Sequence, residues 1–146
     1  MYKHILISPD GSEVAQKGVD HGLSLAKALG ARVTVVTVTE RYPIDPGAHW
    51  IPGPGDMAAW DARQKEWAAR VLADVTAAAG RLSVAAETVH VPDAQPAEAI
   101  LATANKSQCD LIVMASHGRR GLRRLLLGSQ TSEVLVSSPV PVLVIR

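Results

Sequence analysis

The feature that most constrains the fold is a series of short, almost continuously apolar runs separated by segments of helical periodicity. Runs of this kind, rich in valine and isoleucine, are typical of strands buried on both faces of a parallel sheet. We expect five strands, at 4–8, 31–39, 83–91, 110–115 and 139–146. The alternation of strands and helices therefore predicts an α/β fold, a single doubly wound domain whose five-stranded, mainly parallel sheet has helices on both faces.

Four helices are expected between these strands, at 12–29, 57–79, 96–107 and about 129–137. Ser12 suits the N-cap of the first helix, and Gly80 is expected to stop the second. Trp60 and Trp67, seven residues apart, are expected to pack against the sheet. Residues 40–56 contain four prolines and three glycines, a density that excludes regular structure and predicts a long, mobile surface loop.

Length and composition narrow the class of protein. A chain of 146 residues is expected to form one domain over 1–146, and its formal net charge of +1 provides no global field to attract nucleic acid or an anionic membrane. No apolar run approaches the ~20 residues of a membrane-spanning helix. Cys109, the single cysteine, has no internal partner for a disulfide, so a cytoplasmic location is expected.

The candidate site lies where the parallel strands end. Ligands of open parallel sheets bind beyond the carboxyl ends of the strands, where the winding reverses. If the first and fourth strands are neighbours, the turn at Asp10 and the loop 115–128 line one crevice. The helix that begins near Ser129 would present unpaired N–H groups there, and its dipole favours an anion. The sequence therefore predicts a phosphate site.

The chain also resembles the universal stress protein family over essentially its whole length. The resemblance rests on the opening "ILISPDGSE", on "DLIVMASHGRRGLRRLLLGS" and on a final strand that contains proline. Nucleotide-binding members carry the pattern G-x2-G-x9-G-[S/T]. Here Gly118, Gly128 and Ser129 fill the later positions, whereas Ala115 stands at the first glycine. Its methyl group would narrow the approach to the ligand, or forbid a positive φ if the backbone needs one.

The resemblance implies a binding site for ATP, or alternatively AMP or ADP, with Mg²⁺ held through the phosphates. Asp10, with Pro9 beside it, would contact the ribose or adenine, and the backbone of Val38 would contact the adenine. The remaining expected site residues are Met114, Ala115, Ser116, His117, Gly118, Arg119, Gly128, Ser129, Gln130 and Thr131. The family also implies a homodimer formed by the final strand, from Val140 to Ile145.

Simpler interpretations stand beside these. Asp10, Gly11 and Ser12 also fit an ordinary turn and helix cap. The arginine-rich stretch 119–124 is expected to be mostly solvated, with Arg119 nearest the phosphates. Few aromatic residues accompany it, so nucleic acid is not an expected partner. A metal site built only from protein ligands is not expected either, because no paired ligand spacing occurs.

Three functions follow from this interpretation. The first is a nucleotide-dependent regulatory module of the stress response. The second is a slow ATP-hydrolysing enzyme, although the chain has no GxxxxGK[ST] motif. The third is a nucleotide-independent dimer that acts through protein contacts, an alternative that depends on Ala115. An exposed Trp50 in the proline-rich loop would contact a partner or cover the nucleotide.

Overall fold

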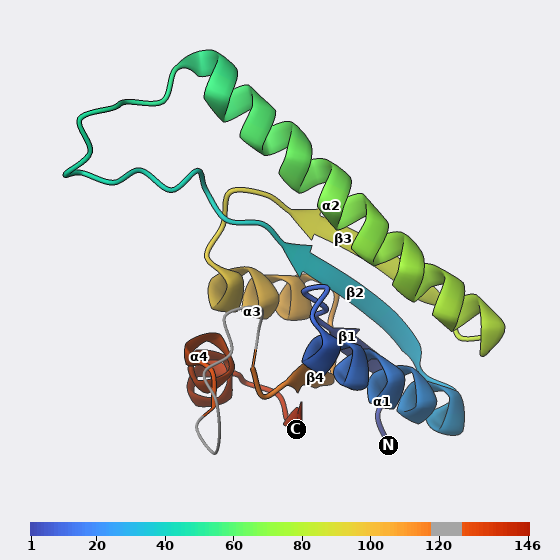
Figure 1. Cartoon of the computed structure of the whole chain (residues 1–146). Coiled ribbons are helices and arrows are strands. Elements are labelled where there is room, and N and C mark those ends of the chain that lie inside the picture. Colours follow the sequence, from blue (N-terminus) through green and yellow to red (C-terminus); the bar gives the residue numbers. More distant parts are fainter. Residues whose placement is uncertain (118–126) are drawn as a thin grey trace.

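A computed structural model describes residues 1–117 and 127–146 of the chain. Its centre is one five-stranded sheet in the order β3-β2-β1-β4-β5, in which every neighbouring pair is parallel (Figure 1). The strands are β1 (His4–Ile7), β2 (Arg32–Val38), β3 (Ala86–Val91), β4 (Leu111–Ala115) and β5 (Val142–Ile145). The predicted α/β fold, with one domain and a parallel five-stranded sheet, is confirmed.

Two helices cover each face of the sheet. Helices α1 (Glu13–Leu29) and α2 (Pro54–Arg81) pack on one face, and α3 (Pro96–Lys106) and α4 (Ser129–Ser137) pack on the other. The predicted helices on both faces are therefore present. Within the described residues, none of these helices is both long and apolar enough to cross a membrane.

The apolar runs form strands because both faces of the sheet are covered. All four residues of β1 and all five of β4 are buried. Successive side chains of a strand point to opposite faces, so Ile5 and Ile7 join the core under α1 and α2 while Leu6 joins the core under α3 and α4. Because both faces of the central strands are covered, their residues are almost all apolar and do not alternate between apolar and polar.

The observed bounds of helix α2 differ from the predicted bounds at both ends. It begins at Pro54 rather than at residue 57, because proline suits the first turn of a helix and the Asp56 carboxylate accepts the N–H of Gly53 at 2.9 Å. It continues through Gly80, where it was expected to stop. Ser83 instead takes the left-handed conformation, with φ 56°, just after the helix. The following strand consequently begins at Ala86 rather than at residue 83.

The tryptophans of α2 do not pack on the sheet as expected. The ring of Trp60 meets Tyr42 edge to face at 5.4 Å, and its indole N–H donates to the carbonyl of Glu40 at 3.3 Å. Trp67 lies against the turn after β1 instead. The reason is that α2 extends past the sheet at its N-terminal end, and its buried residues begin only at Ala68.

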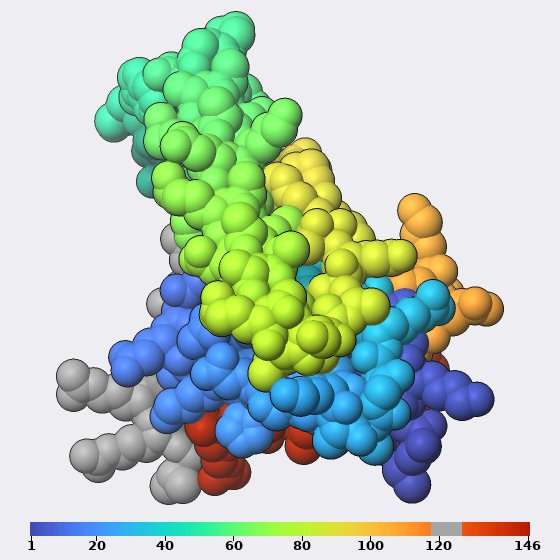
Figure 2. Space-filling view, turned by 90° about the vertical axis from the view of Figure 1, so that its right-hand side faces the viewer, coloured from blue at the N-terminus to red at the C-terminus, as the bar shows by residue number. Residues whose placement is uncertain are grey.

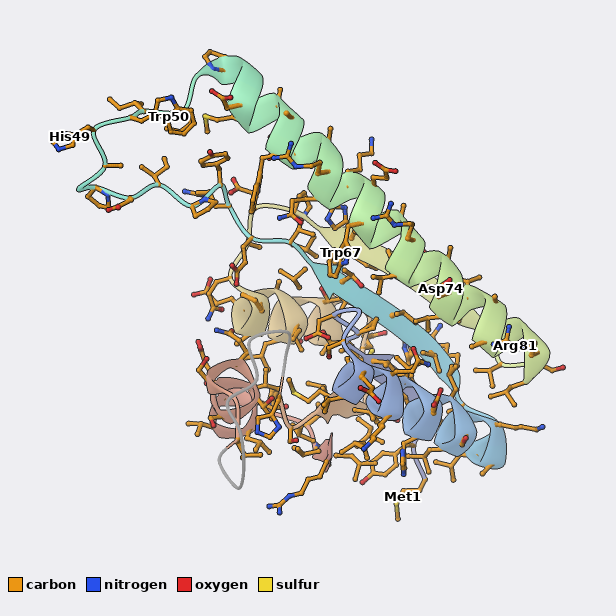
Figure 3. All side chains as sticks on the ribbon, viewed as in Figure 1. Met1, His49, Trp50, Trp67, Asp74 and Arg81 are labelled. Carbon is orange, nitrogen blue, oxygen red and sulfur yellow. The ribbon has the colours of Figure 1, made fainter. Side chains whose placement is uncertain are left out.

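Residues 40–53 and the first turns of α2 form an arm that projects from the body of the molecule (Figure 2). No helix or strand forms between Thr39 and Gly53, in agreement with the predicted loop, but residues 54–56 belong to α2. The arm exposes several large apolar side chains. They are Ile44, Trp50, Ile51 and Met57. Figure 3 shows His49 and Trp50 at the outer part of the arm, far from the ends of the central strands.

A histidine is buried at the amino end of the sheet, opposite the predicted site. His4 is only 5% exposed, and its Nε2 lies 2.7 Å from the hydroxyl of Thr34. Burial, and secondarily the charge of Arg32, lowers the pKa of His4 below its usual value. Nearby Cys109 is also buried, and burial raises the pKa of its thiol. Burial therefore disfavours the charged form of His4 in the folded protein.

We expect the folded protein to lose stability as the pH falls from 7 to 5. The unfolded chain protonates His4 near pH 6.5, whereas the folded chain resists protonation, so the unfolded state binds more protons in this range. His90, whose pKa is lowered by burial and by Lys65, adds to the effect. Urea unfolding at several pH values would measure it. In the variant His4→Gln the free energy of unfolding should depend less on pH, and an unchanged slope would contradict the assignment to His4.

Candidate functional site

The winding of the sheet reverses between β1 and β4. The chain runs outward from β1 through β2 to β3, then crosses to β4 on the other side of β1 and continues to β5. The first and fourth strands are neighbours, which was the condition for the predicted crevice: Ile5 is in register with Leu111 and Ile7 with Val113. The carboxyl ends of β1 and β4 therefore meet at the position where parallel α/β sheets bind their ligands.

The turn after β1 presents a carboxylate at this edge. The Oδ1 atom of Asp10 accepts the N–H of Ser12 at 2.9 Å, and the hydroxyl of Ser12 accepts the N–H of Ala15 at 3.1 Å, which caps α1. The ordinary turn and cap expected here are thus present. Among the described residues no partner bonds to Oδ2 of Asp10. One carboxylate oxygen therefore fixes the turn and the other is available to a ligand.

The end of β2 leaves the backbone of Val38 open toward β1. Residues of β2 bond alternately to its two neighbours: the N–H of Thr39 donates to a carbonyl of β3 at 3.0 Å, and the N–H of Arg32 donates just before β1 at 3.1 Å. The same alternation directs Val38 toward β1. Pairing with β1 ends at Ile7, and Pro9 has no N–H to extend it. The polar backbone groups of Val38 therefore face the position beyond the paired end of β1, which we call the notch.

The ends of the glycine-rich loop are tied together at the end of β4. The N–H of Gly128 donates to the carbonyl of Ser116 at 2.7 Å, and the N–H of Ser116 donates to the carbonyl of Ile145 at 2.7 Å. The buried hydroxyl of Thr131 donates to the carbonyl of Ala115 at 2.9 Å. The bonds made by Gly128 and Thr131 place the start of α4 beside the end of β4, and the bond to Ile145 joins the end of β4 to β5. Gly118 and Arg119, two predicted site residues, lie outside the described residues.

Within residues 1–117 and 127–146, no side chain caps the N-terminus of α4. Gly128 is its N-cap and provides no hydrogen bond from a side chain, and no acidic residue lies in its first turn. The first turns of α1, α2 and α3 each contain one acidic residue. The N–H groups of Ser129, Gln130 and Thr131 belong to the first turn, where a helix offers no carbonyl acceptor. This helix end is therefore the one that best suits an anionic ligand.

Three other predicted residues have contacts that limit their roles. The side-chain oxygen of Gln130 accepts the N–H of Ala97 at 2.9 Å, which ties α4 to α3. Met114 is buried in the core under α3 and α4. His117 Nδ1 lies 3.0 Å from the hydroxyl of Ser116, whereas its buried Nε2 has no hydrogen-bond partner among the described residues. The side chains of Gln130 and Met114 are therefore engaged within the fold, and Met114 is also paired with Val144 of β5.

Comparisons with known proteins identify the family of the chain. The sequence profile described as the universal stress protein family matches residues 1–146. The chain belongs to the universal stress protein family. It is 36% identical over 146 residues to a universal stress protein of Thermus aquaticus, covering 100% of both chains. It is 32% identical to one from Methanocaldococcus jannaschii, covering 100% of this chain and 83% of that protein.

A solved structure extends the agreement to three dimensions. The Methanocaldococcus jannaschii protein MJ0577 superposes with a TM-score of 0.82 and 27% identity, covering 99% of this chain and 96% of that one. The parallel sheet with its helices is thus the fold of the universal stress proteins. In the glycine pattern of this family, the first position is the one at which the chain departs from glycine.

Ala115 occupies that position in this universal stress protein without backbone strain. The described non-glycine residues with positive φ are Ser83, Asp93 and Gln108, so Ala115 has no left-handed geometry. Val113, two residues earlier on β4, faces α1, and the alternation of a strand gives the Ala115 methyl the same direction. On α1, a Cβ added to Gly18 would lie 3.3 Å from the Ala115 nitrogen. The methyl group therefore faces α1 rather than the notch.

We expect Ala115→Gly to leave the affinity for ATP within about twofold of wild type and to lower the stability by about 0.5–1 kcal/mol, because glycine in a strand costs conformational entropy. Calorimetric titration and urea unfolding would measure the two effects. An affinity gain of more than about fivefold, roughly 1 kcal/mol, would show instead that the methyl group obstructs the ligand.

Two contributors to this edge were not predicted. Thr37, fully buried, donates its hydroxyl to the carbonyl of Pro9 at 3.3 Å and so ties β2 to the turn after β1. Trp67 contacts the turn at Gly11. A threonine in an apolar strand signals a buried hydroxyl, but its partner depends on strand order. Helical periodicity placed Trp67 on an inner face and could not identify the turn as its neighbour.

Proposed function

We propose that this universal stress protein binds an adenine nucleotide, ATP or alternatively AMP or ADP, between the ends of β1 and β4, and acts as a nucleotide-dependent regulatory module. The observation that carries the proposal is the N-terminus of α4, which has no side-chain cap among the described residues and is tied beside the carboxyl end of β4 by the bond between Gly128 and Ser116. An anion is the ligand that such a helix end favours.

Relatives of the same fold support a nucleotide as the ligand. One neighbouring structure is a universal stress protein in complex with cAMP, and another, from Archaeoglobus fulgidus, is in complex with dAMP. Both ligands combine an adenine with a phosphate. The edge described above offers a group for each part of such a ligand. These are the backbone polar groups of Val38 for the adenine and the first-turn N–H groups of Ser129 and its neighbours for the phosphate.

The proposed ligand lies across the notch. The adenine bonds to the backbone of Val38, the ribose lies near the free oxygen of Asp10, and the phosphates meet the first turn of α4. Gly118 and Arg119 complete the phosphate end in this proposal. Mg²⁺, when bound, is held by phosphate oxygens and water rather than by a protein cage. Regulation then requires that the nucleotide bind one conformation or assembly better than another.

The proposal includes a homodimer formed by the final strand. β5 is the last strand of the sheet order, next to β4 alone. An edge strand offers unpaired backbone groups to a second chain. Leu143 on β5 and Val136 on α4 are exposed apolar residues near this edge. A cytoplasmic setting is proposed as well, in keeping with the single cysteine, Cys109, held as a buried thiol.

The test begins with the protein purified under native conditions. Denaturation releases any bound small molecule for chromatographic identification, and the stripped protein is titrated calorimetrically with ATP, ADP and AMP. We expect micromolar binding that weakens at least about tenfold in Asp10→Ala and Gly128→Val, since each removes or blocks a contact to the ligand. Ser137→Ala, at the other end of α4, is the matched control and should bind as wild type.

The outcomes separate the candidate functions. Absence of bound nucleotide and of any heat of binding would contradict the proposal and favour a nucleotide-independent dimer. Binding that the two site variants leave unchanged would place the ligand elsewhere on the molecule. Release of inorganic phosphate at a rate proportional to enzyme concentration would identify a slow ATP-hydrolysing enzyme, with the same site in a catalytic role.

A further inference from the structure

Trp67 of α2 lies directly against the turn that presents Asp10. A Cβ added to Gly11 would be 3.2 Å from Cζ2 and 3.5 Å from Nε1 of the indole, and 3.3 Å from a methyl group of Val71. Figure 3 shows Trp67 directed from α2 toward this turn. The contact therefore joins α2 to the loop that carries a proposed ligand-binding carboxylate.

We infer that Trp67 is a positioning residue for Asp10 in nucleotide binding. This inference rests on the proposed function. It adds a residue of α2 to a site otherwise formed by the ends of β1, β2 and β4 and the start of α4, and it makes the indole responsive to the bound nucleotide.

The local geometry of the turn supports this role. Gly11 has φ 77°. Because glycine has no Cβ, its backbone can adopt many conformations unless neighbouring groups hold it. Within the turn, the bond from Ser12 N–H to Asp10 Oδ1 fixes one side of the carboxylate. The backbone at Gly11 is held from outside by the indole. Small movements of Gly11 would rotate the neighbouring Asp10, and binding groups need positions fixed within about 0.5 Å.

The contact is distinct from the general packing of α2. The buried residues of α2, from Ala68 onward, belong largely to the core over β2 and β3. Trp67 is only partly buried and stands at the boundary between that core and the carboxyl edge. Trp60, two turns earlier, contacts Tyr42 and Glu40 in the arm instead. Trp60 is therefore a matched control on the same helix.

The experiment titrates ATP into stripped wild-type protein and into three variants, with unfolding curves to confirm that each is folded. We expect Trp67→Ala to weaken ATP binding about five- to tenfold, and Trp67→Phe and Trp60→Ala to stay within about twofold of wild type. If Trp67→Phe binds ATP as wild type does and Trp67→Ala does not, the aromatic ring positions the turn. The weaker binding of Trp67→Ala then does not come from a loss of fold.

Fluorescence gives a readout that stability alone would not change. In the background Trp50→Phe, Trp60→Phe, residue 67 is the only tryptophan, and ATP should change the intensity or wavelength of its emission. Equal ATP affinities of wild type and folded Trp67→Ala, or an emission unchanged at saturating ATP, would overturn the inference alone. If wild type binds none of ATP, ADP and AMP, the proposed function fails and this inference fails with it.

Discussion

Replacement of Gly22 by alanine is expected to destabilise the protein by about 2 kcal/mol, although alanine is the better helix former. A Cβ at this position of α1 would lie 2.5 Å from Cδ1 and 2.9 Å from Cγ1 of Ile7. Ile7 is 1% exposed at the centre of the sheet, so its side chain has no free space to enter. Urea unfolding at neutral pH measures the loss.

Two further variants separate this clash from helix propensity. Gly80 is also helical, but an added Cβ meets nothing within 4 Å, so Gly80→Ala should stabilise the protein by up to ~1 kcal/mol. Ile7→Val removes the closest atom, and the double variant with Gly22→Ala should lose less than the sum of the two single losses. Stabilisation by Gly22→Ala would show that α1 does not pack this closely on β1.

The close packing of α1 bears on the site as well as on stability. Gly18 and Gly22 lie one turn apart, against Ala115 and Ile7 respectively. Without side chains at these positions, α1 approaches the backbone of β4 and the side chains of β1. The start of α1 follows the turn of Asp10, so the depth at which α1 packs also sets the position of that carboxylate. The two glycines therefore link core packing to the geometry of the notch.

The sequence predicted the framework because burial leaves a strong pattern. The central strands read as continuous apolar runs since both faces are covered, and the observed β1 and β4 are buried throughout. Ser12 and Pro96 indicated the starts of α1 and α3 through local chemistry. The pairing of β1 with β4 was a condition of the predicted crevice, and the register confirms it.

Contacts between distant residues were not predictable in the same way. Gly80 indicated a helix end, yet the helix continues to Arg81 and Ser83 takes the left-handed position. Gln130 was assigned to the phosphates, and its side-chain oxygen instead bonds to the start of α3 at Ala97. The partner of Trp67 depends on how α2 crosses the sheet. Periodicity identifies which face of an element is inward but not what that face meets.

Replacement of Gly11 by alanine is expected to cost about 2 kcal/mol of stability and to weaken ATP binding about tenfold. The residue has φ 77°, which alone costs a residue with a side chain about 1–2 kcal/mol. In addition, the new methyl group would lie 3.2 Å from the indole of Trp67 and 3.3 Å from Val71. To relieve these contacts the turn must shift, and Asp10 shifts with it. Urea unfolding and calorimetric titration measure the two losses.

Gly30 provides the control that separates the two causes. It also has a positive φ, 65°, at the end of α1, but an added Cβ there meets nothing within 4 Å. Gly30→Ala should therefore lose about 1 kcal/mol of stability because of its positive φ, and it should leave ATP affinity unchanged. Equal stability losses at the two glycines would show that the turn can move away from α2. A Gly11→Ala protein that binds ATP normally would show that Asp10 keeps its position without support from the helix, which would also remove the physical basis for the role of Trp67.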